Sequence, residues 1–125
     1  MLFDSDVVIW CLRGNPSAAR VVAEADDRAI AIISYMEVLQ GARDRRDAQE
    51  SKAFLARRSF RTVPLTERIG QRAAIYVEEY SLGSGIDTVD ALIAATAVEH
   101  GLVLCTGNAK HYRAIAELAV KAFRP

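Results

Sequence analysis

Residues 86–98 read I-D-T-V-D-A-L-I-A-A-T-A-V, a run of mostly small and apolar side chains without glycine or proline. This composition is typical of a helix that is buried on most sides. The run opens with Asp87 and Asp90, which a three-residue spacing places on one face of the first turn. Asp87 is the stronger candidate for the N-cap, where the helix dipole stabilises an acid. Asp90 either shares that structural role or points into a metal site, and other acids must decide between the two.

Length and composition favour a single domain over residues 1–125. The 16 basic and 16 acidic residues give a formal net charge of zero, so any nucleic-acid partner must be held by a local patch. No apolar run reaches the roughly 18–20 residues of a membrane span, and the N-terminus lacks the basic region of a signal peptide. Cys11 and Cys105 form no metal-binding pair. We therefore expect reduced thiols in a cytoplasmic protein that does not enter the membrane.

Short apolar runs alternate with helical patterns along the whole chain, which indicates an α/β fold with a mostly parallel central sheet. Asn15 and Pro16 are expected to start one helix, and Thr66 to start another. Gly101 is expected to follow the end of the helix that begins near Asp87. The expected strands cover residues 1–4, 29–33, 62–65, 102–106 and 120–123.

Polar side chains follow three of these strands. Asp4 ends the first, Glu37 lies one turn after the second, and Asn108 follows the strand that ends at Thr106. Asp90 begins the helix that leads into that last strand. Because ligands of parallel sheets bind outside the carboxyl ends of the strands, we expect these groups to converge on one edge.

Each candidate also has an ordinary structural explanation. Ser34 and Glu37 fit an S-x-x-E capping box, and Asp4 fits the cap of the helix that follows it. Asn108 fits a turn, and His111 is expected on the surface or in packing. The case for a common site therefore rests on four distant segments mapping to the same edge of one sheet.

Three acids gathered in a partly dry site would repel one another by several kcal/mol, even at an effective dielectric constant of about 20. A protein tolerates such a group by protonating one acid or by binding a cation. Oxygen ligands without His or Cys select Mg²⁺, or alternatively Mn²⁺. Asp4, Glu37 and Asp90 therefore suit metal-assisted hydrolysis of a phosphodiester bond.

Four motifs, taken in order, resemble those of PIN-domain ribonucleases, and among these the VapC-type toxins of bacterial toxin–antitoxin pairs. The resemblance spans nearly the whole chain and implies a three-layer α/β/α sandwich with a mostly parallel sheet. The motifs are M-L-F-D-S-D-V-V-I (1–9), I-S-Y-M-E-V-L-Q-G-A (33–42), D-A-L-I-A-A-T-A (90–97) with a preceding Asp, and L-V-L-C-T-G-N-A-K-H-Y (102–112).

The resemblance implies that Asp4, Glu37 and Asp90 are the metal ligands and catalytic acids. It also implies that Asn108 takes part at the place where many members have a fourth Asp. An Asn brings no charge, so a single Mg²⁺ is expected rather than two.

Neighbouring positions also bear on the resemblance. Ser5 stands where the family often has Thr, and its hydroxyl, like that of Thr106, is expected to support the site. Gly107 replaces an Arg that is common in the family, which would weaken a phosphate contact.

The expected function is that of a Mg²⁺-dependent endoribonuclease, the toxin of a type II toxin–antitoxin pair. The family implies a homodimer, and an antitoxin whose C-terminal segment covers the acidic pocket. Trp10, Leu12 and Tyr35 are candidate contact residues. The basic residues available to hold the RNA backbone are Arg43, Arg45, Arg46, Arg57, Arg58 and Arg61.

Two other functions compete with this one. Asp4 and Asp6 after a strand also suit a haloacid-dehalogenase-like phosphatase, with Asp4 as nucleophile and Asp6 as acid/base. That family needs a downstream lysine, and this chain has only Lys52, Lys110 and Lys121. The second alternative is a catalytically silent PIN-like module that only binds protein or RNA. It would bind no Mg²⁺ or Mn²⁺ at the acidic edge.

Overall fold

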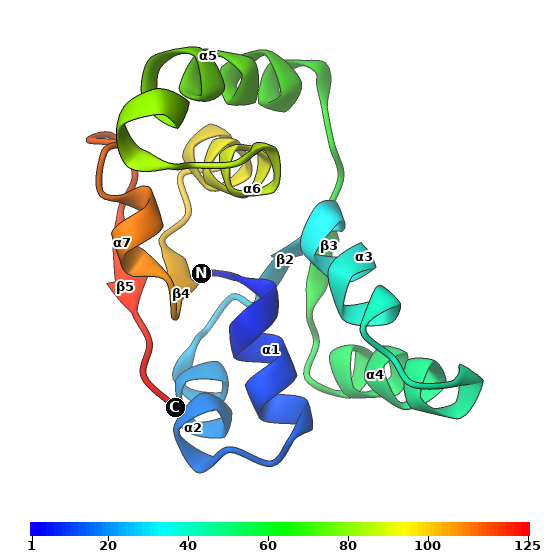
Figure 1. Ribbon diagram of the computed structural model, residues 1–125. Coiled ribbons are helices and arrows are strands. Elements are labelled where there is room, and N and C mark those ends of the chain that lie inside the picture. The colour runs from blue at the N-terminus through cyan, green and yellow to red at the C-terminus, as the bar shows by residue number, and fades with distance from the viewer.

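A five-stranded sheet with all strands parallel forms the centre of the computed structural model, which describes residues 1–125 (Figure 1). The strands follow the order β3-β2-β1-β4-β5, so the chain builds outward in one direction from β1 and later returns to build in the other. The strands are β1 (Leu2–Phe3), β2 (Ala29–Ala31), β3 (Arg61–Val63), β4 (Leu104–Thr106) and β5 (Val120–Ala122).

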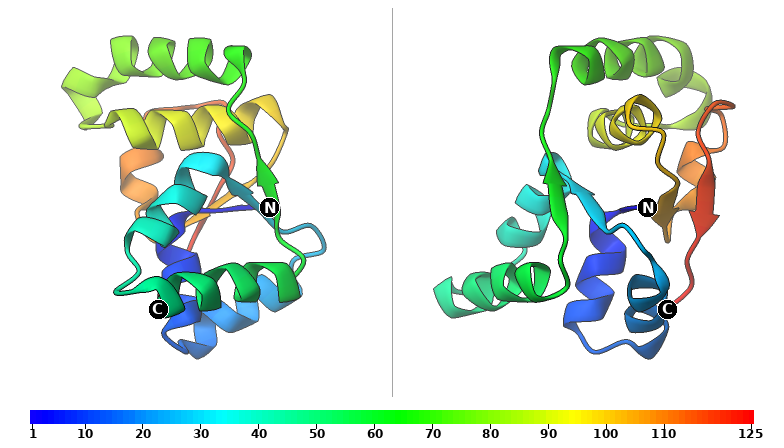
Figure 2. Two further views of the ribbon diagram at one scale, coloured as in Figure 1. Left: turned by 90° about the vertical axis from the view of Figure 1, so that its right-hand side faces the viewer. Right: turned by 180° about the vertical axis from the view of Figure 1, so that it is seen from behind.

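Helices cover both faces of this sheet, as Figure 2 shows from two further sides. Helices α5 and α6 pack against each other on one side of the molecule, and α1, α2 and α4 lie on the other (Figure 1). The helices are α1 (Ser5–Leu12), α2 (Pro16–Glu24), α3 (Ile32–Gln40), α4 (Arg45–Arg57), α5 (Glu67–Ser84), α6 (Thr88–Glu99) and α7 (Ala109–Tyr112).

Alternate residues of β1, β2 and β4 belong to two separate apolar cores. Leu2 and Leu104 belong to a core with α5 and α6, whereas Phe3 and Cys105 belong to a core with α1 and α2. All four side chains are fully buried. A sheet buried on both faces is what helices on both sides require, so the predicted three-layer sandwich is confirmed.

Several predicted helix boundaries are confirmed by side-chain caps. The Asn15 side chain accepts from the Ala18 amide, with Pro16 at the first helical position of α2. Thr66 caps α5, and Asp87 caps α6 by accepting from the Asp90 amide over 2.8 Å. Gly101 follows the end of α6 with a φ of 63°, in the left-handed region that favours glycine.

The prediction for the start of α3 is wrong. The second strand ends at Ala31, and α3 begins at Ile32 with Ala31 as an N-cap that makes no side-chain hydrogen bond. Ser34 is therefore buried inside the helix and caps nothing, so Glu37 belongs to no capping box. The apolar run of residues 29–33 hid this boundary because Ile32 and Ile33 suit a buried strand and a buried helix equally.

Helix α5 includes Gly83 and ends at Ser84, and Gly85 caps it with a φ of 73°, in the left-handed region that favours glycine. Both cysteines are unpaired, as predicted, although only Cys105 is fully buried and Cys11 is partly exposed. None of the helices combines the length and apolar character that a membrane crossing needs.

Candidate active site

The candidate site lies where β1 and β4 run side by side in the middle of the sheet. These two neighbours are far apart in sequence. After β1 the chain continues to β2 on one side of this pair, and after β4 it continues to β5 on the other side. Such a reversal of strand order leaves a crevice outside the carboxyl ends of the strands. Asp4 directly follows β1 and Thr106 ends β4, so both reach the crevice.

Asp4 is held in one orientation by donors from both ends of the chain. Its side chain is 6% exposed, and Oδ1 accepts from the Ser5 amide over 2.8 Å, which makes Asp4 the N-cap of α1. Oδ2 accepts from the Thr106 hydroxyl over 2.8 Å. The Thr106 oxygen in turn accepts from the Asn108 amide over 3.0 Å. The expected capping role of Asp4 is thus confirmed, and a charged acceptor still faces the crevice.

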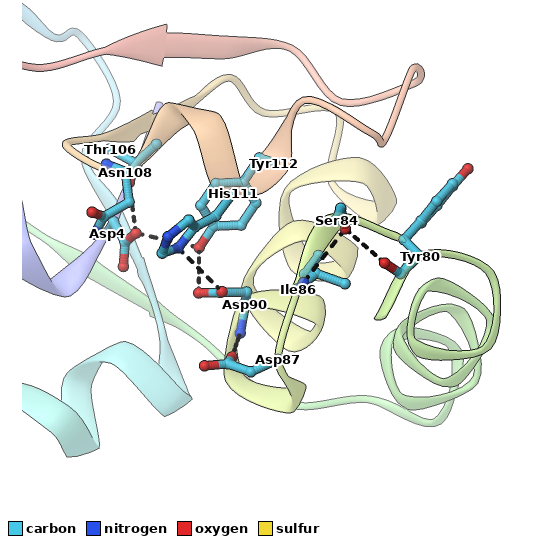
Figure 3. Close-up of polar contacts among 10 residues, drawn as sticks. All are labelled: Asp4, Tyr80, Ser84, Ile86, Asp87, Asp90, Thr106, Asn108, His111 and Tyr112. Atoms are coloured by element: carbon cyan, nitrogen blue, oxygen red, sulfur yellow. Dashed lines mark hydrogen bonds and ion pairs between the residues drawn. The ribbon is translucent and has the colours of Figure 1, made fainter. Parts of the chain in front are cut away.

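A buried tyrosine joins Asp4 to Asp90. The Tyr112 hydroxyl lies 3.3 Å from Asp4 Oδ2 and 3.2 Å from Asp90 Oδ1 (Figure 3). Its single proton is donated to one carboxylate at a time. Burial, together with the charges of Asp4 and Asp90, raises the pKa of Tyr112, so this hydroxyl remains a donor at neutral pH.

Asp90 projects from the first turn of α6 toward this hydroxyl, while Asp87 points away to cap the helix (Figure 3). Asp87 therefore has the structural role of a helix cap, and Asp90 belongs to the candidate site. His111 Nδ1 lies 3.6 Å from Asp90 Oδ2, so His111 contacts the site and is no mere surface residue. Burial and then the charge of Asp87 raise the pKa of Asp90.

Glu37 faces the same group of acids from α3. Burial raises the pKa of its carboxyl, and the charges of Asp4 and Asp90 raise it further, while the Ser5 side chain opposes the shift. Its Oε1 atom is buried without a hydrogen-bond partner. Buried carboxylate oxygens are normally paired, so this atom is suited to a ligand or a proton.

Asp6 is a fourth acid at this edge. Burial, together with the charge of Asp4, raises the pKa of Asp6 to about 6. Its Oδ2 accepts from the Gly107 amide over 2.9 Å, and its Oδ1 is buried without a partner. The sequence predicted only a phosphatase role for Asp6, because no local sequence pattern indicates that α1 turns its side chain toward β4.

These residues fit a hard divalent ion by their chemistry. Asp4, Glu37 and Asp90 offer only oxygen atoms, two of them have raised pKa values, and Glu37 has an unpaired buried oxygen. No group of three or more His, Cys, Asp or Glu side chains is close enough to form a complete cage. Mg²⁺ commonly keeps several waters and uses one or two protein carboxylates together with substrate phosphates, so a partial set is compatible with it.

The other predicted residues divide between two ends of the sheet. Asn108 lies at the site, where its backbone amide donates to Thr106, but its side chain makes no cap for α7. Arg61 opens β3 at the amino end, opposite to the acids, and forms a two-pronged ion pair with Asp27. Arg57 and Arg58 end α4 just before it. These three arginines therefore lie away from the acidic edge.

Two basic residues at α7, Lys110 and Arg113, were not predicted to contact RNA. Lys110, His111 and Arg113 belong to or directly follow α7, the helix that carries Tyr112. Lys110 and Arg113 are exposed. Lys110 lies within the 102–112 motif and Arg113 directly follows it, which was the available signal.

Comparison with known proteins agrees with this fold. The PIN domain family matches residues 1–118, and the chain belongs to this family. This membership removes the haloacid-dehalogenase-like alternative.

Similarity to individual proteins narrows the assignment within the PIN domain family. The chain is 35% identical to Ribonuclease VapC10 of Mycobacterium tuberculosis, over 100% of this chain and 98% of that protein. It is 33% identical to Ribonuclease VapC19 of the same species, over 94% and 95%. The predicted VapC-type assignment is therefore confirmed.

Solved structures give the same result for the fold. A toxin–antitoxin complex from Klebsiella pneumoniae contains a chain with a TM-score of 0.80 and 28% identity, covering 94% of both chains. VapBC2 from Rickettsia felis, bound to a DNA fragment from its promoter, gives a TM-score of 0.81 at 20% identity, covering 98% of both chains.

Proposed function

We propose that this protein is an endoribonuclease that depends on Mg²⁺, or alternatively on Mn²⁺, and the toxin of a type II toxin–antitoxin pair. The observation that carries the proposal is the convergence of Asp4 and Asp90 on one tyrosine hydroxyl, with the unpaired oxygen of Glu37 facing them. The relatives named as VapC ribonucleases support the choice of RNA as substrate.

The chain's own residues would share the chemistry as follows. Bound Mg²⁺ would supply Lewis-acid activation of the scissile phosphate and of the attacking water. Asp4 and Asp90, held by Thr106 and Tyr112, would hold the ion. Glu37 has a raised pKa and an unpaired oxygen, so it is suited to accept the proton of the attacking water.

The backbone of the RNA would be held chiefly by the α7 segment. Lys110 lies on α7 and Arg113 directly follows it, and both are exposed. Phosphate contacts of this kind give affinity without sequence selection. Arg57, Arg58 and Arg61 do not share this role, because they lie at the other end of the strands.

Two substitutions test the proposal, each compared with a matched control. Asp4→Asn and Asp90→Asn should abolish Mg²⁺-dependent RNA cleavage and weaken Mn²⁺ binding measured by calorimetry, while circular dichroism shows a folded protein. Asp26→Asn, an exposed acid just before β2, should change neither. Full cleavage by a pure, folded Asp90→Asn protein would refute the assignment. A wild type that binds no Mn²⁺ would instead favour the silent module.

The RNA target is open to a direct measurement. Cellular RNA ends sequenced after brief expression of wild type and of Asp90→Asn should differ at the sites that this enzyme cleaves. A wild-type profile identical to that of the variant would contradict nuclease action in the cytoplasm.

An antitoxin would dock beside the site as well as over it. A pocket of about 490 Å³ lies between α1, α3 and α4, and Ile9, Leu12 and Val38 line it together with Arg43. Leu12, a predicted contact residue, is 37% exposed there, whereas Trp10 and Tyr35 pack partly against the core. The pocket contains neither Asp4 nor Glu37, so a peptide bound there would have to continue along α1 toward its N-terminal end to cover the acids. The structural neighbours from toxin–antitoxin complexes support such a partner.

The partner can be tested by co-expression with the adjacent open reading frame. The two proteins should co-purify, and Leu12→Asp should separate them without changing the fold. Size-exclusion chromatography of the separated toxin should give the mass of the expected homodimer. An adjacent protein that never co-purifies would contradict the toxin–antitoxin assignment.

A further inference from the structure

Asp6 and Gly107 meet across the junction of β1 and β4, and the proposed function gives neither a role. The Gly107 amide donates to Asp6 Oδ2 over 2.9 Å. A Cβ atom on residue 107 would lie 2.5 Å from that oxygen and 3.5 Å from the Asp6 Cγ atom. The first distance is shorter than any real contact of a Cβ atom, so the Asp6 carboxylate fills the space that a side chain at 107 would need.

Space, and not backbone conformation, is what requires glycine at this position. Gly14, Gly85 and Gly101 have φ values of 82°, 73° and 63°, in the left-handed region. Gly107 is not among the residues with positive φ. A residue with a side chain would therefore adopt this backbone without strain, and Asp6 is the obstacle.

The contact fastens α1 to the segment that carries the hydrogen-bond donors of the site. Gly107 stands between Thr106, which donates to Asp4 Oδ2, and Asn108, whose amide donates to Thr106. Asp6 itself lies two residues after Asp4, in the first turn of α1. One carboxylate thus links the two strand ends from which the crevice is formed.

Asp6 holds this contact in an unfavourable environment. Its second oxygen, Oδ1, is buried and has no hydrogen-bond partner. A carboxylate with one oxygen buried and unpaired is a poor choice for stability alone. The placement is explained if the position of the Gly107 amide matters for something other than stability.

We propose that Asp6 is a positioning residue of this site, with Gly107 as its required partner. By holding the Gly107 amide, Asp6 fixes the Thr106 hydroxyl and therefore the orientation of the Asp4 carboxylate. The proposal rests on the proposed function for its metal and activity readouts. Its stability readout is independent of that function.

The test is a double-mutant cycle of Asp6→Ala and Gly107→Ala, with melting temperature and Mn²⁺ affinity as readouts. With Asp6 present, Gly107→Ala should lower the melting temperature by about 3 °C or more, because the methyl group expels the carboxylate. With Ala at position 6, the same change should leave the melting temperature equal or raise it, since alanine reduces the entropy of the unfolded chain. Gly70→Ala, in α5 with no atom near its Cβ position, is the matched control and should not lower it.

Mn²⁺ affinity separates positioning from direct ligation. Each single variant should bind Mn²⁺ about 10–100-fold more weakly, the usual loss when a group that orients a ligand is removed. The double variant should be no weaker than the weaker single variant, and kcat for RNA should fall more than KM rises. Asp6→Asn keeps an oxygen that accepts from the Gly107 amide, so it should retain most of the wild-type affinity.

Three results would overturn the proposal. If Asp6→Asn is as defective as Asp6→Ala, the charge of Asp6 is used directly. If the losses in Mn²⁺ affinity multiply in the double variant, the two residues do not act as a unit. If Gly107→Ala lowers the melting temperature equally with and without Asp6, the steric pairing is wrong. A wild type without Mn²⁺ binding or RNA cleavage refutes the proposed function instead, and the melting temperatures still decide the pairing.

Discussion

Thr106→Val is the substitution whose effect follows most directly from the geometry of the site. The two side chains have nearly the same shape, and Thr106 is fully buried, so the change removes only the hydroxyl. That hydroxyl donates to the Asp4 carboxylate over 2.8 Å and accepts from the Asn108 amide over 3.0 Å. Valine can do neither.

The magnitude follows from these two bonds. A hydrogen bond to a charged group contributes about 1.5–3 kcal/mol, and a buried donor left without a partner costs about 1–3 kcal/mol. The Asn108 amide is only partly buried, so water compensates for part of its loss. We expect Thr106→Val to lower the free energy of unfolding by about 2–4 kcal/mol, or the melting temperature by roughly 6–20 °C for a chain of this size.

Thr96→Val is the matched control for this change. Thr96 is 3% exposed, and its hydroxyl donates to the Leu92 carbonyl one turn earlier in α6. A bond of this kind within a helix contributes little, so the loss should stay below about 1 kcal/mol. Urea denaturation of the two variants and the wild type measures the difference. Equal losses for both, or a loss below 1 kcal/mol for Thr106→Val, would refute the reasoning that this hydroxyl supports Asp4.

Three further predictions concern charge. Lys110→Gln should weaken RNA binding and reduce the steepness of its salt dependence, whereas Arg57→Gln, at the other end of the sheet, should change neither in a fluorescence titration. The fold raises the pKa of Asp6 from 3.8 to about 6, so the folded state binds the proton of this carboxyl more tightly than the unfolded state does. The stability that this protonation contributes is therefore lost as pH rises from about 4 to 7. Urea midpoints should therefore fall less over this range in Asp6→Asn than in the wild type, and equal slopes would contradict the assignment. The pKa of Glu99 is lowered by Arg72, so Arg72→Met should remove stability that is present at neutral pH and lost as pH falls below about 4.

The parts of the fold that follow from local sequence were predictable. Asp87 caps α6 because an acid at a helix start can bond to the nearby amides, and nothing distant competes for it. Asn15 followed by Pro16 marks the start of α2 for the same reason. The alternation of apolar runs with helical patterns likewise leads to a parallel sheet covered on both faces.

Features that depend on packing were not predictable in this way. Ser34 and Glu37 satisfy the sequence pattern of a capping box, but α3 starts three residues earlier, at Ile32, and leaves Glu37 facing the other acids. In the sequence, Tyr112 is indistinguishable from an ordinary core residue. Only the approach of α7 to α6 brings its hydroxyl between two carboxylates. Asp6 shows its contact with Gly107 only once β1 and β4 are neighbours.

The pairing of β1 with β4 also determines when the site first exists during synthesis. Asp4 is made well before its partners Thr106 and Tyr112, which come 102 and 108 residues later in the chain. Strands β2 and β3 can assemble on β1 before then, but they bring none of these donors. An unfinished polypeptide, or a fragment cut off before β4, therefore has no complete acidic crevice, and the site first exists once β4 and α7 have both been made.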